Sequence, residues 1–370
     1  MKERLTVLHT ESSLGWGGQE QRTLRECLGI RKLGMRPAVL CPPGAELGRR
    51  AASAGIEVFP CPMRKSYDLA AIRTILRVLR EQAVDIVNTH SGRDSLLAGV
   101  AARLSSRRPA VVRTRHLALR ITSRISYTYL PHRVVTVSGY VKEYLIREGV
   151  PGERIVVVPT GIETGRFGNG AAPGNLREEL GLPQDALLVG SISVLRIKKG
   201  HRFLLEAAPS VLAAFPRTVF VIVGTGPQEK NLRNAIDSMR LSGSVRMLGH
   251  REDVPNVLLS LDLFVLPTME EALGTAFVEA MAAGRAVVGC RVGGVPEVVE
   301  EGRTGLLVPP ENPVALAEAI RSLLADGELR RRMGEAGRQA VLTRYSEEEM
   351  CRQMWELYRS LLSERGKECQ

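Results

Sequence analysis

Short apolar runs alternate with helix-forming stretches along the whole chain, which restricts the fold to an α/β class with parallel sheets. The runs are rich in Val, Ile and Leu, as buried parallel strands are. In the first half we expect strands at residues 5–9, 37–41, 57–59, 86–89, 110–114, 134–137 and 155–158. In the second half we expect strands at residues 187–194, 219–223, 245–248, 263–267, 286–290 and 305–308. Each half is long enough for a doubly wound domain with its own core.

The pattern divides the chain into two domains and a terminal helix. We predict an N-terminal domain at residues 1–165 and a C-terminal domain at residues 166–345, joined near the glycine-rich segment 161–174. Residues 346–370 form a helix, because Ser346 is followed three residues later by a glutamate, as in a capping box. An apolar stripe then follows at helical spacing: Met350, Met354, Leu357 and Leu361. We expect this helix to pack back toward the N-terminal domain, which would fasten the two domains together; packing on its own domain is the alternative.

Positive charge is concentrated in the first half of the chain. The net charge is +11, and residues 1–165 hold 26 Lys and Arg against 14 Asp and Glu, whereas residues 166–370 hold 25 against 26. A basic surface attracts phosphate-bearing partners such as anionic lipids or phosphorylated glycans, although solubility alone would also explain it. We expect no nucleic acid partner, because aromatic content is only 4% and no nucleic-acid-binding motif occurs.

The cysteines and the N-terminus indicate a cytoplasmic protein. The six cysteines include no CxxC pair and no metal-ligand spacing, so we expect reduced thiols and no metal site. The chain runs into its first strand without a signal-peptide pattern, and no apolar run is long enough to span a membrane.

The segment 267–285 carries the most specific chemistry. It places Glu271 and Glu279 eight residues apart, with Gly274 and Thr275 between them, after a buried strand and at the start of a helix that stops at a glycine. Backbone N–H groups at a helix N-terminus hold anions, so a diphosphate there, with a carboxylate on each side, would suit a nucleotide-sugar. An ordinary strand–turn–helix unit with two solvated glutamates fits the same spacing.

Basic residues follow the first strand of the second half. Arg196 and Lys199 lie before a helix, where arginine and lysine suit a polyphosphate, and a solvated basic turn is the alternative. In the first half, His116 and His90 each follow a predicted strand and would face the ligand crevice as hydrogen-bond donors or proton carriers. Buried histidines without a catalytic role are the alternative.

Glycine-rich turns follow strands in both halves. Gly17 and Gly18 lie between the first strand and a helix, where glycine lets a ligand or another backbone approach closely. Gly224 and Gly226 follow a strand of the second half. Neither turn has the full dinucleotide-binding glycine pattern, which argues against a nicotinamide oxidoreductase.

Taken in order, these motifs resemble the retaining glycosyltransferases of family 4, whose GT-B architecture has two Rossmann-like domains facing a cleft and a C-terminal helix that crosses back to the first. The resemblance spans essentially the whole chain. It is carried by residues 17–20, 135–138, 157–162, 223–227, 248–253, 271–284, 293–297 and 302–309.

The resemblance implies roles for individual residues. Glu279 would hold the donor ribose and Glu271 the donor sugar, while His116 would lie near the reacting sugar. The amides of Gly274 and Thr275 would bind the diphosphate. Four further donor-binding residues are implied: Lys199, Arg196, Gly17 and Gly18. Arg196 departs from the family pattern, because Val194 occupies the position at which the family carries its arginine.

The resemblance also implies an activity. We expect transfer of a sugar, with retention, from a nucleotide diphosphate donor, UDP being the commonest in the family, without a cofactor or a tightly bound metal. The basic first half suggests an acidic or membrane-borne acceptor, such as lipopolysaccharide, capsule or glycolipid, and a peripheral position on the cytoplasmic face of a membrane. A nucleotide-sugar 2-epimerase and a non-enzymatic nucleotide-binding protein of the same architecture are the alternatives.

Overall fold

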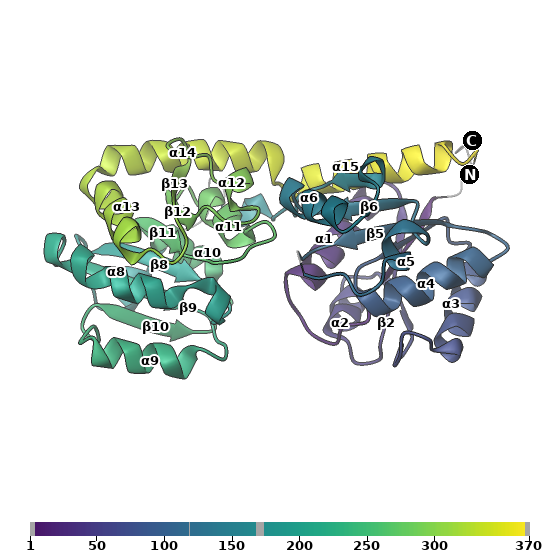
Figure 1. The fold of residues 1–370 in the computed structure, drawn as a ribbon, viewed down its shortest axis with the longest axis horizontal. Coiled ribbons are helices and arrows are strands. Elements are labelled where there is room, and N and C mark those ends of the chain that lie inside the picture. The colour runs from purple at the N-terminus through teal and green to yellow at the C-terminus, as the bar shows by residue number, and fades with distance from the viewer. Residues whose placement is uncertain (1–3, 118, 168–173, 367–370) are drawn as a thin grey trace. The chain divides into compact units, whose positions relative to one another are not determined.

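The computed structural model describes residues 4–117, 119–167 and 174–366. The chain forms two compact units (Figure 1). The first unit joins Met1–Gly161 to Glu347–Gln370, and the second is the continuous stretch Ile162–Ser346. The central part of the predicted linker, residues 168–173, lies outside the described residues.

The first unit is built on a seven-stranded parallel sheet of order β3-β2-β1-β4-β5-β6-β7. The strands are β1 (Thr6–Thr10), β2 (Arg36–Cys41), β3 (Glu57–Pro60), β4 (Ile86–Thr89), β5 (Ala110–Arg115), β6 (Arg133–Thr136) and β7 (Ile155–Val157). The helices are α1 (Gly18–Lys32), α2 (Glu46–Ser53), α3 (Leu69–Glu81), α4 (Gly92–Leu104), α5 (Ile125–Thr128), α6 (Gly139–Arg147) and α15 (Glu347–Ser363). A 3-10 turn, η1 (Gly152–Arg154), precedes β7.

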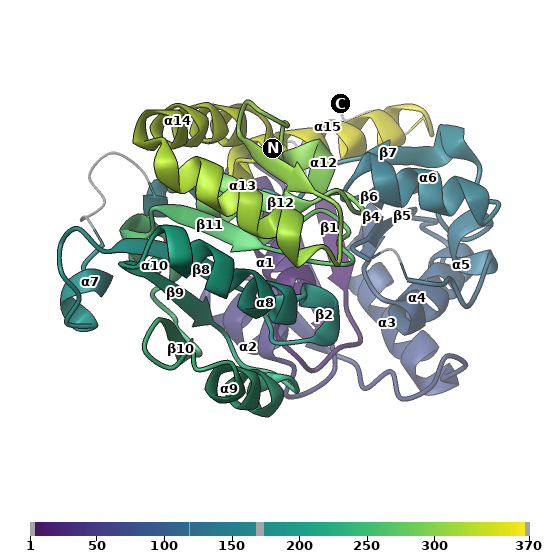
Figure 2. The same cartoon turned by 60° about the vertical axis from the view of Figure 1, so that its left-hand side comes forward.

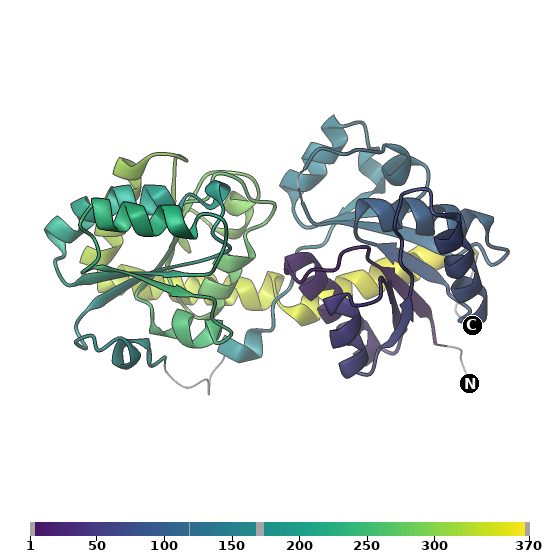
Figure 3. The same ribbon diagram turned by 90° about the horizontal axis from the view of Figure 1, so that it is seen from below.

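Side chains alternate between the two faces of this sheet, and each face has its own helical cover. Leu8 and Val87 pack with α3 and α4, whereas Val7 and Ile86 pack with α1 and α15. α15 lies beside α1 (Figure 3). Its apolar stripe is buried in the core of the first unit: Met350, Met354, Leu357 and Leu361.

The second unit contains a six-stranded parallel sheet of order β10-β9-β8-β11-β12-β13. Its strands are β8 (Leu187–Ile192), β9 (Thr218–Val223), β10 (Val245–Gly249), β11 (Leu263–Leu266), β12 (Val287–Cys290) and β13 (Gly305–Val308). Its helices are α7 (Leu176–Glu179), α8 (His201–Ala214), α9 (Glu229–Ser238), α10 (Val254–Ser260), α11 (Thr275–Ala282), α12 (Val295–Val298), α13 (Pro313–Ala325) and α14 (Gly327–Arg344). Two 3-10 turns complete it: η2 (Thr164–Phe167) and η3 (Ile197–Lys199).

Helices cover both faces of the second sheet as well. On one face α8 and α13 lie side by side (Figure 2) and share a core with Phe220 and Val265. On the other face Phe277 of α11 meets Phe264 of β11 edge to face, with ring centroids 5.6 Å apart. The two units are therefore Rossmann-like α/β folds, as the alternation predicted.

All thirteen strands predicted from the sequence occur in the described residues, with ends that differ by at most two positions. The strand predicted at 187–194 stops at Ile192, because residues 193–195 turn away to pair with the loop after β9. No helix in the described residues is both long and apolar enough to cross a membrane.

Candidate functional site

The strand order of both sheets reverses direction once, and that point marks where ligands bind in open α/β sheets. In the second unit the reversal lies between β8 and β11, which pair with each other although β9 and β10 come between them in sequence. In the first unit it lies between β1 and β4. Most of the predicted site residues lie in the loops and helix starts that follow β1, β8 and β11, whereas His116 follows β5.

In the second unit the loops after β8 and β11 are joined by an ion pair between Lys199 and Glu271. Both side chains are largely buried, with 18% and 14% of their side-chain surface exposed. Backbone contacts hold the loops in register, because the Met269 amide donates to the Lys198 carbonyl at 2.7 Å and the Thr268 hydroxyl donates to the same oxygen at 3.1 Å. The two residues predicted on separate motifs therefore meet.

The N-terminus of α11 lies in the same loop as Glu271. Gly274 is the N-cap residue in a left-handed conformation, with φ of +95°, a conformation that glycine adopts readily. The helix starts at Thr275, and Phe277 donates its amide back to the Gly274 carbonyl at 3.0 Å. Within the described residues, the amides of Thr275 and Ala276 donate no hydrogen bond. Unpaired amides at a helix N-terminus suit an anion, and Thr275 is one of the two residues whose amides the sequence analysis assigned to the diphosphate.

The conformation of the Glu271 loop depends on two glycines that sequence reasoning used only for the family resemblance. Gly293 has φ of +54°, and a Cβ there would lie 1.9 Å from the Glu271 carbonyl oxygen. A Cβ on Gly294 would lie 2.3 Å from the Ala272 carbonyl oxygen, and the Gly294 amide donates to the Glu271 carbonyl at 3.1 Å. The backbone at 293–294 thus supports the turn that carries Glu271.

Two predicted residues lie nearby with less defined partners. Glu279 is half-buried one turn after Thr275 on α11. Arg196 is exposed just before η3, and its guanidinium makes no hydrogen bond or ion pair with any described residue. The structure therefore gives Lys199 a defined position and leaves the position of the Arg196 side chain open.

In the first unit three histidines form a continuous chain on one face of the sheet. His9 is the penultimate residue of β1, while His90 and His116 follow β4 and β5, the next two strands across. His9 Nδ1 is 3.1 Å from His90 Nε2, and His90 Nδ1 is 3.1 Å from His116 Nε2. Sequence reasoning selected His116 and His90 but missed His9. The signal that could have indicated His9 is its place at the end of a predicted strand, the same kind of place that His90 and His116 occupy.

Burial lowers the pKa of all three imidazoles. The pKa of His90 and that of His116 lie well below the usual value, chiefly because burial disfavours the charged form. The nearby Arg22 guanidinium lowers both further. The pKa of His9 is also lowered by burial, partly offset by the Glu26 carboxylate. Burial therefore favours the neutral form of all three rings.

Two buried carboxyl groups, those of Glu11 and Asp94, follow β1 and β4. Asp94 accepts hydrogen bonds from the Thr10 hydroxyl at 2.9 Å and the His90 amide at 2.9 Å. Burial, together with the Asp94 charge, raises the pKa of Glu11 to about 7. The Glu11 carboxylate accepts a hydrogen bond from the Ser13 amide at 3.0 Å, in the turn that follows β1.

The predicted glycines of the first unit begin α1. The Gly17 amide donates to the Glu20 carboxylate at 2.8 Å, which caps the helix. A Cβ on Gly18 would meet no described atom within 4 Å, so internal packing does not require glycine there. That free space is compatible with a ligand approaching the backbone.

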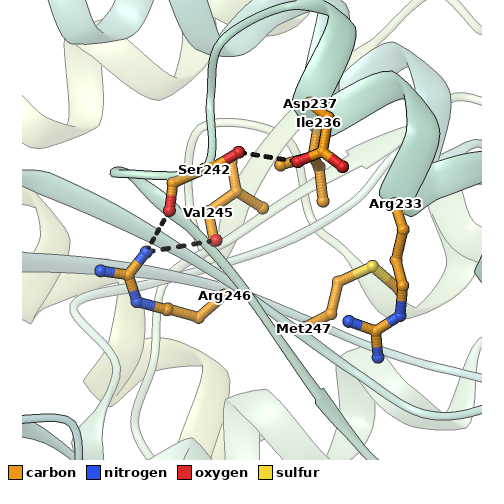
Figure 4. A pocket seen from close by; sticks show the side chains of 7 residues that line it. All are labelled: Arg233, Ile236, Asp237, Ser242, Val245, Arg246 and Met247. Carbon is orange, nitrogen blue, oxygen red and sulfur yellow. Dashed lines mark hydrogen bonds between the residues drawn. The ribbon is translucent and has the colours of Figure 1, made fainter.

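A separate pocket lies between α9 and β10 (Figure 4). It is lined by Arg233, Ile236, Asp237, Ser242, Val245, Arg246 and Met247. Ser242 precedes β10, so this pocket reaches the amino-terminal end of that strand rather than the carboxyl ends where the predicted site lies. Among the described residues, no group of three or more His, Cys, Asp or Glu side chains could hold a metal ion.

Two family models match consecutive parts of the chain. The model described as Glycosyltransferase Family 4 matches residues 16–166, and the model described as Glycosyl transferases group 1 matches residues 174–340. The chain belongs to this glycosyltransferase family. Lys199 and Glu271 fall within the second matched region, and His90 and His116 fall within the first, whereas His9 lies before it.

Curated relatives of this glycosyltransferase cover part of its length. D-inositol 3-phosphate glycosyltransferase of Corynebacterium urealyticum is 35% identical over 219 residues, which are 56% of this chain and 51% of the relative. The UDP-Gal:α-D-GlcNAc-diphosphoundecaprenol α-1,3-galactosyltransferase of Escherichia coli is 31% identical over 258 residues, 65% of this chain and 66% of that relative. The chain thus spans about half to two thirds of the length of these relatives.

Solved structures match the glycosyltransferase over nearly its full length. A glycosyltransferase from Rickettsia africae has a TM-score of 0.87 at 23% identity, covering 97% of this chain and 99% of that chain. HepE from Anabaena, solved in complex with UDP, has a TM-score of 0.87 at 21% identity, covering 96% of this chain and 100% of that chain. These similarities show a shared GT-B fold.

Proposed function

We propose that this glycosyltransferase moves a sugar from a UDP-sugar to an envelope glycan or glycolipid, retaining the configuration at the anomeric carbon. The proposal is carried by one observation: Lys199 pairs with Glu271 in the loop that leads into α11, whose first two amides donate no hydrogen bond to a described residue. A cation, a carboxylate and a helix N-terminus in one loop pair match the diphosphate and sugar of a nucleotide-sugar. The UDP complex of HepE and the UDP-galactose relative support uracil as the base.

Each residue has a chemical task in this proposal. The amides of Thr275 and Ala276 bind the diphosphate, and Glu279 accepts hydrogen bonds from the ribose hydroxyls. Glu271 accepts from a hydroxyl of the donor sugar. Lys199 pairs with Glu271 in the structure, and we propose that it turns to the diphosphate when the donor binds. An ammonium serves both partners, because it is a compact point charge on a flexible stem.

The reaction breaks the bond between the anomeric carbon and the leaving diphosphate, and forms a bond to the acceptor oxygen on the same face. The diphosphate takes the acceptor proton. Its growing charge is stabilised by Lys199, Arg196 and the N-terminus of α11, so we propose that no tightly bound metal is needed. Of these groups, Lys199 has the most defined position, and the exposed Arg196 side chain must move to contribute.

An acceptor in or near an anionic membrane fits the charge of the first half, which carries the whole positive excess of the chain. Exposed apolar and basic residues alternate after β5, with Leu117, Leu119 and Ile125 among Arg120 and Arg124. The Rhizobium meliloti relative named a lipopolysaccharide core biosynthesis glycosyltransferase supports this class of acceptor. We therefore propose a peripheral position on the cytoplasmic face of a membrane.

A nucleotide screen followed by product analysis tests the proposal. UDP should raise the melting temperature more than GDP or ADP, and a panel of UDP-sugars with lipid-linked acceptors should yield an α-linked product detected by mass spectrometry and NMR. Donor incubated alone separates a transferase from an epimerase, because only an epimerase converts the sugar without acceptor. The proposal would be refuted if none of the nucleotide diphosphates raised the melting temperature.

A further inference from the structure

The three-histidine chain ends at a buried carboxylate on α1. His9 Nε2 lies 3.9 Å from Glu26 Oε1, and both groups are fully buried. The atoms His9 Nε2 and Glu26 Oε2 have no hydrogen-bond partner among the described residues, and they belong to the same pair of side chains. The far end of the chain is His116, whose Nδ1 makes no hydrogen bond with any described residue.

One oxygen of Glu26 accepts hydrogen bonds from two donors, as an ionised carboxylate does. The Tyr358 hydroxyl of α15 donates to Glu26 Oε1 at 2.5 Å, and the Asn88 amide donates to the same oxygen at 3.3 Å. The orientation of the Asn88 side chain is fixed, because its nitrogen also donates to the Tyr358 oxygen at 2.8 Å and its oxygen accepts from Thr114 at 2.9 Å. A carboxylate held in this way presents negative charge to His9.

Hydrogen-bond counting and the Glu26 carboxylate together favour one arrangement of protons. A neutral imidazole has one N–H and one lone pair, so a chain of neutral rings must run in a single direction. The Glu26 carboxylate favours the proton of His9 on Nε2, which leaves Nδ1 to accept from His90 Nε2. His90 Nδ1 must then accept from His116 Nε2. The opposite direction would aim the lone pair of His9 at the carboxylate.

We propose that Glu26, acting through His9 and His90, fixes His116 as the Nε2–H tautomer, so that its Nδ1 offers a lone pair at the carboxyl edge of the sheet. Glu26, His9 and His90 are positioning residues in this scheme. The Nδ1 lone pair accepts a hydrogen bond from a hydroxyl of a bound sugar and cannot donate one. This consequence for catalysis rests on the proposed function, whereas the tautomer itself does not.

The residues around the three histidines favour neutral rings, and neutral rings keep all the hydrogen bonds of the histidine chain in one direction. In this arrangement a proton added to His90 Nδ1 would oppose the Nε2–H of His116, whereas a proton added to His116 Nδ1 would remove the lone pair at the end of the chain. Burial lowers the pKa of both rings, as described above. The charged and titratable groups that face the chain are Arg22 and Glu26 of α1, Tyr358 of α15, and Arg113 and Arg115 of β5.

The tautomer is measured directly, without any transferase assay, by long-range ¹H–¹⁵N NMR of protein labelled in its six histidines. His116→Gln identifies the His116 signals by their loss. We expect the pattern of a neutral Nε2–H ring for His116 in the unmodified protein. A neutral Nδ1–H pattern or a protonated ring at neutral pH would overturn the proposal.

The role of the carboxylate is tested by Glu26→Gln, which keeps the shape and removes the charge. We expect an Nδ1–H population of His116 to appear in this variant. Glu20→Gln is the matched control, because Glu20 is another buried carboxylate on α1 and caps Gly17 instead. An unchanged tautomer in Glu26→Gln would contradict the proposal. If Glu26→Gln does not fold, His9→Gln interrupts the chain one step later and gives the same comparison.

The kinetic consequence is measured with the same variants. We expect Glu26→Gln to lower kcat about 10-fold or more, the size of effect typical of a residue that orients a functional side chain, with donor KM changed by less than about twofold. A loss confined to KM would count against a positioning role. If the unmodified protein transfers no sugar, the proposed function fails while the NMR result still decides the tautomer.

Discussion

The ammonium of Lys199 pairs with the carboxylate of Glu271, and this pair joins the loops that follow β8 and β11. The next residue on each loop's amino-terminal side forms a second, looser pair, Lys198 with Glu270 at 3.7 Å. The second pair is more exposed, at 35% and 45% of the side-chain surface. The loops thus carry two similar ion pairs of which only one has the burial expected of a site.

These neighbouring pairs give a matched test of the donor site. Lys199→Ala should lower kcat roughly 100-fold, because it removes a cation that stabilises the leaving diphosphate. Lys198→Ala should change kcat by less than about twofold, since an exposed pair contributes little. Steady-state rates with a UDP-sugar measure both. Equal losses in the two variants would contradict the assignment of Lys199.

Arg196 tests whether an exposed arginine completes the diphosphate site. Its side chain has no partner among the described residues, so Arg196→Ala should leave the melting temperature without ligand unchanged. With UDP, we expect the dissociation constant to rise about 10-fold, as for the loss of one charge-assisted hydrogen bond. Calorimetric titration of UDP into the variant measures this change. An unchanged constant would assign phosphate binding to Lys199 and the amides alone.

The glycine that supports the Glu271 loop has a control elsewhere in the unit. Gly293→Ala should destabilise the protein by about 3 kcal/mol, because a Cβ would lie 1.9 Å from the Glu271 carbonyl oxygen. Gly302 has φ of +74° and open space around it, so Gly302→Ala should cost only about 1 kcal/mol of backbone strain. Denaturant unfolding compares the two. Equal costs would show that the loop moves away without resistance.

The raised pKa of Glu11 predicts that the stability of the protein depends on pH. Its pKa is raised from 4.5 to about 7, so between these values the folded state holds a proton that the unfolded state has released. Stability therefore falls as pH rises from about 4.5 to about 7, by up to about 3 kcal/mol, and levels off above that. Glu11→Gln lacks this contribution. The stability of the unmodified protein relative to Glu11→Gln should decline over this window, and a constant difference would contradict the prediction.

The last helix offers a test of the core of the first unit. Met354 of α15 is fully buried against the sheet and α1, so Met354→Ala should destabilise the first unit by about 2–5 kcal/mol. Glu356→Ala on the exposed side of the same helix should change stability by less than about 0.5 kcal/mol. Hydrogen exchange of the β1 and β4 amides reports on the first unit specifically. No change in their protection in Met354→Ala would contradict the packing.

Most of the fold could be predicted from local pattern, because Val- and Ile-rich runs at the predicted spacing form strands in any parallel sheet. The meeting of Lys199 and Glu271 was predictable as well, since each follows a strand next to the point where strand order reverses. Both signals depend only on residues that are close in sequence and on the usual topology of such sheets.

The parts that escaped prediction depend on register between strands far apart in sequence. The histidine chain needs β1, β4 and β5 to align so that three side chains on one face touch end to end. In the sequence Gly293 resembles an ordinary turn glycine, because nothing there indicates that the Glu271 carbonyl oxygen lies against it. The departure from the family pattern at Val194, in contrast, is visible in the sequence. Titration of UDP into Arg196→Ala measures whether Arg196 takes over the role of the missing arginine.

The second unit is one continuous stretch, whereas the first is completed by α15, almost two hundred residues after its other strands and helices. During synthesis the second unit therefore has all its own segments before the first does. Until α15 emerges from the ribosome, the apolar side of α1 and the carboxylate of Glu26 lack their cover and their tyrosine donor. The nascent first unit therefore stays incompletely packed until α15 has been synthesised.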